Sequence, residues 1–275
     1  MAENQHFVGL NEEDFIKEAL NIVSKAKEKN IVLRIIGGLA VRLHIKDDPL
    51  AVLVYKRRFD NSMNVFADLD LVGYRKQRGD IEKMFVQLQY QPDRMINPLF
   101  GDRRLIFYHP KGYFHIDVFL DKLEFSHDII FYDKQDKRRL EFSFPAITPT
   151  DIVLEKLQIH QINKKDLIDL IALFANKSIT SSDEDGSING SYIAKILSQD
   201  WGFWYDATNN LSMVNYVAKD MLAKGDIQET MYDKMLQKIG CLQQLIEKEP
   251  KTKDWIKRSQ IGTKKPWYRE VSDIF

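Results

Sequence analysis

The sequence predicts an α/β fold: a mixed β-sheet core with flanking helices over residues 1–145, followed by a helical domain over residues 146–275. Two observations support this division. Short runs rich in β-branched and aromatic residues alternate with helical patterns before Pro145, whereas helical patterns dominate after it. Thr148-Pro149-Thr150-Asp151 marks the change, because it supplies a Thr cap, a Pro at the first helical position and an acid in the first turn.

The composition permits a large core and excludes a strongly charged protein. The chain has 275 residues, of which 44% are hydrophobic, so it can bury one large core or two modest ones. Its 40 Lys and Arg residues balance its 40 Asp and Glu residues. No overall charge therefore draws the chain to nucleic acid or to an anionic membrane, and any basic surface must be local.

The cysteine count and the short apolar runs indicate a cytoplasmic protein. The sole cysteine, Cys241, excludes an intrachain disulfide framework and a cysteine-rich zinc site. The first residues, MAENQHFVGL, lack the cationic start and the apolar stretch of a secretory signal. The apolar runs are far shorter than the roughly 20 residues that a membrane helix needs. We therefore expect no membrane partner.

The first elements are expected to be a helix, a strand and a second helix. Asn11 can cap a helix that runs to about Lys29, because three acids follow it in the first turn. The apolar run 31–36 predicts a buried strand, which a Gly-Gly pair ends. Residues 39–45 predict a helix that starts directly after the glycines.

The stretch 46–64 follows no clear pattern. Asp47-Asp48-Pro49 interrupts the apolar periodicity, so we interpret this stretch as an insertion or long loop. A polar, glycine-containing segment, 181–190, predicts a second loop. Strands are expected at 65–74, 103–109, 113–120, 129–133 and 138–144, and the turn Pro110-Lys111-Gly112 is expected to join the second and third of them as a hairpin. Helices are expected at 79–90, 149–161, 164–176, 190–199 and, two or more, across 203–248.

Three features in order could carry chemistry: a Gly-Gly turn between a strand and a helix, an Asp-x-Asp strand, and one Asp on a later strand. Gly37 and Gly38 let a phosphate approach the backbone at the start of a helix. Asp68 and Asp70 share one face of their strand, where two carboxylates repel unless a cation such as Mg²⁺ joins them. Asp117 on a neighbouring strand would complete a site for two metal ions roughly 3.5–4 Å apart.

Each feature also has a purely structural interpretation. A Gly-Gly pair after a strand is commonly a plain turn, and an Asp-x-Asp pattern is commonly a solvated strand face. Asp117 is harder to explain in this way, because Ile116 and Val118 flank it and a buried, unpaired carboxylate is costly. The order of all three features favours a functional site.

The combination resembles the nucleotidyltransferase superfamily. The resemblance rests on IIGGLAVRLH (35–44), ADLDLV (67–72) and HIDVF (115–119), and the GGLAV motif is similar to AbiEii-type toxin nucleotidyltransferases and their prokaryotic relatives. It implies a nucleotidyltransferase-like catalytic core over 1–145. It also implies an enzyme that binds a nucleoside triphosphate and two Mg²⁺ ions, with Asp68, Asp70 and Asp117 as catalytic and metal-binding residues.

The helical half extends the resemblance through EKLQIHQINKKDLIDL (155–170). By that resemblance Lys156 would touch the triphosphate, Asp166 would lie near the catalytic pocket, and Asp169 would be structural. The alternative is an ordinary amphipathic helix in which Lys165 and Asp169 form an i,i+4 pair.

The resemblance leaves two functions open. In the first, nucleoside monophosphate moves from a nucleoside triphosphate to a hydroxyl of RNA, protein or a small molecule. A toxin-like role with an antitoxin partner would favour RNA or protein as the acceptor. In the second, the same fold is a non-catalytic module that binds a nucleotide, RNA or a partner protein.

Overall fold

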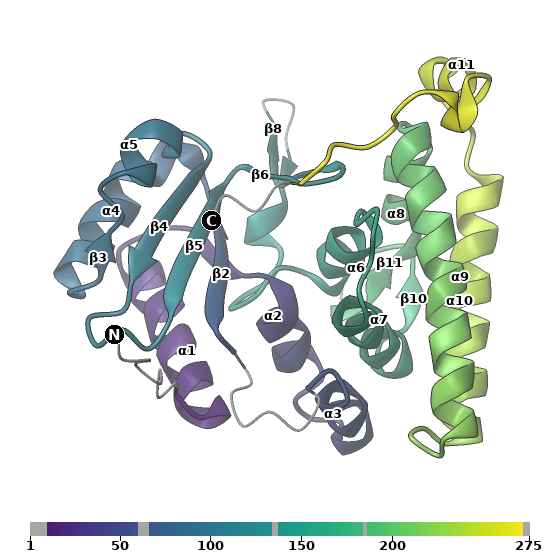
Figure 1. Ribbon diagram of the computed structural model, residues 1–275, viewed down its shortest axis with the longest axis horizontal. Coiled ribbons are helices and arrows are strands. Elements are labelled where there is room, and N and C mark those ends of the chain that lie inside the picture. Colours follow the sequence, from purple (N-terminus) through teal and green to yellow (C-terminus); the bar gives the residue numbers. More distant parts are fainter. Residues whose placement is uncertain (1–9, 60–65, 134–136, 184–185, 272–275) are drawn as a thin grey trace, which may run out of the picture. The chain divides into compact units, whose positions relative to one another are not determined.

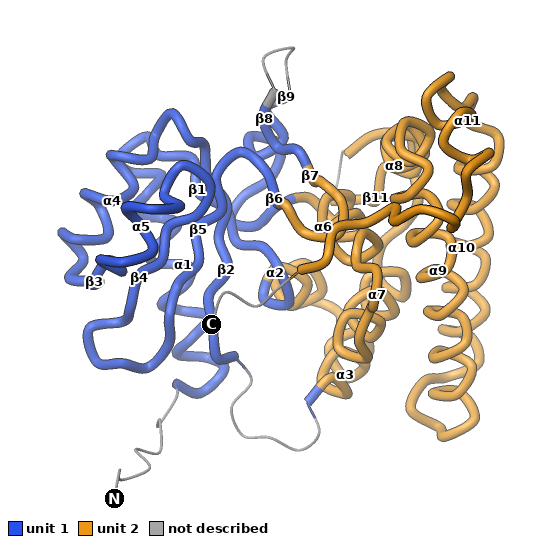
Figure 2. Tube along the Cα trace, turned by 45° about the horizontal axis from the view of Figure 1, so that its top comes forward, with its two compact units in different colours: residues 1–39, 59–123, 130–147 blue, residues 40–58, 124–129, 148–275 orange. Residues whose placement is uncertain are grey.

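The chain forms two compact units that are each discontinuous in sequence. The computed structural model describes residues 10–59, 66–133, 137–183 and 186–271. Figure 2 colours the two units. The first contains residues 1–39, 59–123 and 130–147, and the second contains residues 40–58, 124–129 and 148–275. The predicted fold class is confirmed, because a mixed β-sheet with flanking helices precedes a mainly helical C-terminal part. The domain division at 145/146 stays a prediction.

Within the described residues, the first unit is built on a five-stranded sheet with the order β1-β2-β5-β4-β3. β1 is antiparallel to β2, β2 is parallel to β5, and β4 is antiparallel to both β5 and β3. Figure 1 shows β2, β5 and β4 side by side. The strand bounds are β1 Leu33–Ile35, β2 Asp68–Gly73, β3 Gln91–Pro92, β4 Arg104–Tyr108 and β5 His115–Leu120.

The sheet has one apolar face and one charged face, because side chains alternate along each strand. The apolar face is fully buried, and helix α4 covers it with Phe85, whose ring stacks on Phe107 at 4.3 Å between centroids. This burial fixes the register, since a one-residue slip would turn the whole apolar set outward. The buried residues of this face on the three central strands are Leu69, Leu71, Ile116, Val118, Leu105 and Phe107.

The helices of the first unit follow their sequence signals. Asn11 caps α1, accepting a hydrogen bond from the Asp14 backbone N–H at 2.9 Å, as predicted. The described helices of this unit are α1 Glu12–Glu28, α4 Arg78–Gln87 and α5 Ile96–Phe100, with 3-10 turns at Arg75–Gln77 and Arg139–Glu141. Helix α2, Gly37–His44, begins at the glycines rather than after them.

The strand expected at 138–144 is wrong. Strand β9 ends at Arg138, and the chain continues as the 3-10 turn Arg139–Glu141. The burial pattern gives the reason, since Arg139 and Leu140 are both buried and the next two residues are exposed. That pattern lacks the alternation of a strand with one exposed face.

The loop expected at 46–64 is also wrong over much of its length. Residues Pro49–Lys56 form helix α3, and the Asp48 carboxylate caps it by accepting from the backbone N–H groups of Leu50 and Ala51. The helix forms because it buries Ala51, Val54 and Tyr55. Residues 60–64 of the expected loop lie outside the described residues.

The second unit is mainly helical, as predicted for this part of the chain. Figure 1 shows the long helices α9 and α10 side by side. Among the described residues, no helix is both long and apolar enough to cross a membrane. The helices from residue 149 onward are α6 Pro149–Leu157, α7 Lys164–Asn176, α8 Gly190–Leu197, α9 Trp201–Ala223, α10 Glu229–Lys248 and α11 Lys253–Ser259, with a 3-10 turn at Gly262–Lys264.

Three short strand pairs complete the described structure. The loop expected at 181–190 includes β11, which pairs in parallel with β10 just before it. The strand expected at 129–133 is divided between β7 and β8. Strand β9, which pairs with β8, includes only the first residue of the strand expected at 138–144. The bounds are β6 Lys122–Glu124, β7 Asp128–Ile130, β8 Tyr132–Asp133, β9 Lys137–Arg138, β10 Ile179–Thr180 and β11 Ile188–Asn189.

Candidate active site

The three predicted aspartates meet on the charged face of the sheet. The parallel register of β2 and β5 sets Asp70 directly opposite Asp117, and Asp68 opposite His115. Residues in register and residues two apart on a strand share a face, so all four side chains lie on the same side of the sheet. Asp68 is exposed, Asp70 is half-buried and Asp117 is buried. The sequence therefore predicted a real juxtaposition of acids.

The glycine turn lies beside the backbone of Asp70. The Ile36 N–H donates to the Asp70 carbonyl oxygen at 3.0 Å, and helix α2 begins at the next residue. Gly37 has a φ of 68°, in the left-handed region that favours glycine. A side chain at this position would strain the turn that leads from β1 into α2.

Asp117 has a partner that the sequence interpretation did not assign. The Arg104 Nε donates to Asp117 Oδ1 at 2.9 Å, and a terminal nitrogen of the same guanidinium donates to Oδ2 at 2.6 Å. This is a bidentate, charge-assisted pair. Strand β4 positions it, because Ile106 lies opposite Asp117 and Arg104 lies two residues before Ile106 on the same face.

His115 lies between two of the acids. Its Nδ1 is 3.9 Å from Asp68 Oδ1, and its Nε2 is 3.7 Å from Asp117 Oδ2. The interaction with Asp117, followed by the charges of Asp68 and Asp70, raises the pKa of His115 against the opposing effect of burial. Burial raises the pKa of Asp117, but His115 and Arg104 outweigh it and hold that pKa below the ordinary value.

Some of the carboxylates on this face, but not all, are suited to bind a hard cation such as Mg²⁺. Within the described ranges, no three His, Cys, Asp or Glu side chains converge as a cage for a metal ion. Mg²⁺ does not require such a cage, since it keeps several waters and binds through one or two carboxylates together with substrate phosphates. Asp68 and Asp70 meet that requirement. Asp117 meets it less well, because Arg104 already contacts both of its oxygens.

Lys156 and Asp166, predicted to bind nucleotide, lie in the second unit and are both buried. The Lys156 Nζ donates to Asp166 Oδ1 at 2.7 Å and lies 3.3 Å from Asp169 Oδ2. Burial alone would lower the pKa of Lys156, but these carboxylates outweigh it and raise that pKa. These residues belong to a buried ion cluster in this unit, and a contact between Lys156 and nucleotide stays a prediction.

Arg58 is the fourth charged member of this cluster and was not predicted as part of it. Its Nε lies 3.4 Å from Asp169 Oδ1, and a terminal nitrogen donates to the Tyr55 hydroxyl at 2.7 Å. Tyr55 lies in helix α3, and Arg58 follows the end of that helix. Because α3 was not predicted from the sequence, this contact was not predicted either. The alternative i,i+4 pairing of Lys165 with Asp169 is wrong, because Asp169 is fully buried and Lys165 is exposed. Asp169 lies beside Lys156 instead.

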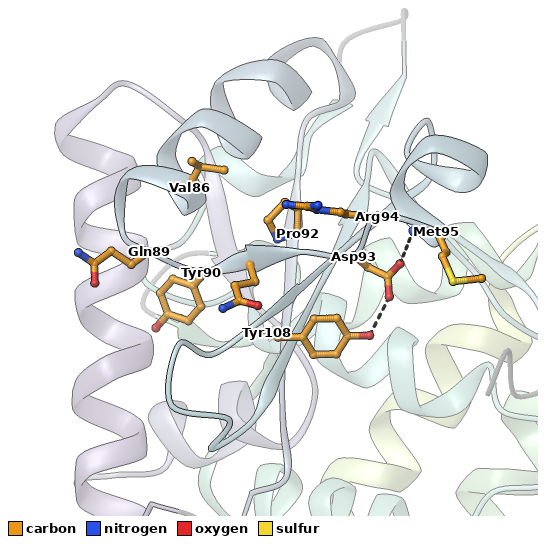
Figure 3. Close-up of a pocket in the computed structure, with 9 residues that line it drawn as sticks. Val86, Gln89, Tyr90, Pro92, Asp93, Arg94, Met95 and Tyr108 are labelled. Carbon is orange, nitrogen blue, oxygen red and sulfur yellow. Dashed lines mark hydrogen bonds between the residues drawn. The ribbon is translucent and has the colours of Figure 1, made fainter.

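A pocket of about 680 Å³ opens at the β3–β4 edge of the sheet, within the first unit. Tyr108 lines it, and the same residue lies opposite His115 in the β4–β5 register. Figure 3 shows the Tyr108 hydroxyl pointing to Asp93, to which it donates at 2.7 Å. Polar and apolar side chains both line the pocket: Val86, Gln89, Tyr90, Gln91, Pro92, Asp93, Arg94, Met95 and Tyr108.

Comparison with known proteins gives distant structural likenesses, among them the following two. No family model matches the sequence, and no curated protein is significantly similar to it. The antibiotic-resistance factor ANT(2'')-Ia is 12% identical, with a TM-score of 0.38 over 59% of this chain and 83% of the other. A nucleotidyltransferase-like protein from Paracoccidioides brasiliensis is 14% identical, with a TM-score of 0.37 over 68% of this chain and 89% of the other. At this distance, conclusions about chemistry rest on the chain's own residues.

Proposed function

We propose that the protein is a metal-dependent nucleotidyltransferase that moves a nucleoside monophosphate from a nucleoside triphosphate to an acceptor hydroxyl. One observation carries the proposal: the β2–β5 register gathers Asp68, Asp70, Asp117 and His115 on one face of the sheet. The glycine pair at the start of α2 adjoins strand β2 through the Ile36–Asp70 backbone hydrogen bond. The order of these motifs also resembles the nucleotidyltransferase superfamily.

The glycine pair would bind the phosphates, and the acids of the charged face would bind the cation. Gly37 and Gly38 would hold the phosphates against the backbone at the start of α2, where peptide N–H groups and the helix dipole favour an anion. Asp68 and Asp70 would hold Mg²⁺. When bound, that ion would neutralise the phosphate charge that develops during an in-line displacement.

The reaction forms one bond and breaks one. The acceptor oxygen bonds to the α-phosphorus, the bond from the α-phosphorus to the bridging oxygen of the β-phosphate breaks, and pyrophosphate leaves with that electron pair. We assign the hydroxyl proton to a ring nitrogen of His115, and Asp117, whose Oδ2 lies 3.7 Å from His115 Nε2, would stabilise the charged ring that results. Both groups lie on the charged face of the sheet, opposite the two proposed cation ligands in the β2–β5 register.

The acceptor would be a hydroxyl of RNA, protein or a small molecule. The pocket beside Tyr108 is a candidate place for it, because Tyr108 and His115 are opposite each other in the β4–β5 register. The resemblance to toxin nucleotidyltransferases favours RNA or protein, and it also suggests an antitoxin partner.

The proposal is tested by label transfer. Purified protein, Mg²⁺ and each nucleoside triphosphate labelled at the α-phosphate are incubated with total RNA or cell lysate. The wild type should label one class of acceptor, and the Asp68→Asn/Asp70→Asn double variant should reduce transfer to background. Asp80→Asn is the matched control, because Asp80 is an exposed acid on α4. Equal transfer by the wild type and the double variant would refute the proposal.

The Arg104–Asp117 pair favours a second candidate function, a non-catalytic nucleotide-binding module. An acid whose two oxygens already bind a guanidinium is less available for chemistry. In that case the wild type would bind Mg²⁺ and triphosphate together and the Asp68→Asn variant would lose this binding, but no acceptor would become labelled.

A further inference from the structure

Arg104 holds both carboxylate oxygens of the third acid. Its two hydrogen bonds to Asp117 measure 2.9 and 2.6 Å, and the Asp117 side chain is only 7% exposed. The guanidinium carbon also lies 5.4 Å from the centre of the Phe119 ring, at cation–π distance. Phe119 lies opposite Arg104 in the β4–β5 register, so the hairpin itself fixes the position of the guanidinium.

A carboxylate in this arrangement is a poor metal ligand. The planar guanidinium fork matches both oxygens at once, and its positive charge repels a cation approaching the same group. Binding a metal ion through Asp117 would require a part-buried, charge-assisted pair to open. Removing one partner from such a pair is strongly unfavourable.

Asp68 and Asp70 are more exposed to solvent than Asp117. The Asp68 side chain is 48% exposed, and Asp70 is half-buried two residues further along the same strand face. Both carboxylates are therefore more accessible to a hydrated ion than that of Asp117, and one or two carboxylates are the usual protein contribution to an Mg²⁺ site.

We propose that this face binds one divalent cation, through Asp68 and Asp70, and that the Arg104 guanidinium is a fixed positive charge in place of a second metal ion at Asp117. Arg104 is then a positioning residue that acts through Asp117. The inference rests on the proposed function only in taking Asp68 and Asp70 as cation ligands.

Manganese counting tests the inference without requiring turnover. Mn²⁺ is titrated into the protein without nucleotide, and the electron paramagnetic resonance signal of free Mn²⁺ gives the number of bound ions and their Kd. The wild type should bind one ion. Asp70→Asn should weaken it at least tenfold, whereas Asp117→Asn should weaken it much less, because Asp117 is not a ligand and acts on the ion only through the charge that it shares with Arg104.

Two substitutions of Arg104 probe its role as a charge. Arg104→Lys keeps the charge and should still bind one ion. Arg104→Gln frees Asp117 and should add a second ion or tighten the first at least fivefold. If circular dichroism shows that Arg104→Gln is unfolded, the comparison of Asp117→Asn with Asp70→Asn decides alone.

Three results would overturn the inference: two ions in the wild type, no bound ion in the wild type, or equal weakening by Asp117→Asn and Asp70→Asn. Failure of the proposed function gives a different result. In that case no acceptor is labelled by any triphosphate, while the wild type still binds one ion, which Asp117→Asn weakens much less than Asp70→Asn does.

Discussion

Replacing Lys156 by Met tests whether this lysine is a buried structural ion or a contact for nucleotide. The wild-type cluster contains two cations, Lys156 and Arg58, and two acids, Asp166 and Asp169, so its formal charges cancel. Lys156→Met keeps most of the apolar stem but leaves one buried negative charge without a partner.

The magnitude follows from the burial of the partners. Side-chain exposure is 7% for Lys156, 12% for Asp166 and 0% for Asp169, so solvent screens the remaining acids little. Breaking a buried ion pair by removing one partner costs about 3–5 kcal/mol. At about 2–4 °C per kcal/mol for domains of 150–250 residues, the melting temperature should fall by roughly 10 °C.

Urea denaturation followed by far-UV circular dichroism measures the change, with Lys165→Met as the control. Lys165 is exposed on the same helix as Asp166, so its loss should change the free energy of unfolding by no more than about 0.5 kcal/mol. Adding Asp169→Asn to Lys156→Met restores charge balance, and the double variant should lose less stability than the two single variants together. A Lys156→Met protein that is as stable as the wild type but binds triphosphate at least tenfold more weakly would refute the structural interpretation.

Three further predictions concern other buried contacts. Asp206→Asn should cost about 2–4 kcal/mol at neutral pH, because the carboxylate accepts hydrogen bonds from two histidine rings and the Trp267 indole at 2.8–3.0 Å. Burial raises the pKa of Asp206, but those hydrogen bonds outweigh it and hold the pKa below the ordinary value. The stabilisation by the carboxylate is therefore present above about pH 4 and is lost as the pH falls further. Thermal melts measured over a series of pH values would detect this loss. Gly202→Ala should cost about 1–3 kcal/mol and alter tryptophan fluorescence, because a Cβ there would lie 2.4 Å from the Trp267 carbonyl oxygen. Asn97→Ala should cost about 1–3 kcal/mol in denaturant melts, because it leaves the buried Ile106 N–H without its 2.7 Å acceptor and the Ile106 carbonyl oxygen without its 3.0 Å donor.

Elements with strong local signals could be predicted from the sequence. The Asn11 cap and the Thr148-Pro149 helix start both occur as predicted, because capping depends on residues within one turn. The Asp-x-Asp strand and the hairpin at 103–120 also form, since their alternation reflects which face is buried. These two elements carry the predicted acids, so much of the candidate site followed from local pattern.

Helix α3 was missed although its signal matches one that was interpreted correctly. Asp48-Pro49 supplies a cap and a proline at the first helical position, as Thr148-Pro149 does. The interruption of the apolar periodicity at Asp47-Asp48-Pro49 suggested an insertion or long loop instead. The missed helix concealed the ion pair of Arg58 with Asp169, because that contact joins residues far apart in the sequence.

The partner of Asp117 could have been found before a metal ion was assigned to it. The predicted turn at Pro110-Lys111-Gly112 limits the register of the hairpin, and the observed register sets Ile106 opposite Asp117. Arg104 then lies on the same face, one diagonal step away, within reach of a long side chain. An acid between two apolar residues, with an arginine at the diagonal position of the partner strand, therefore predicts a buried ion pair. A metal-ligand assignment from the acids alone omits this competing cation.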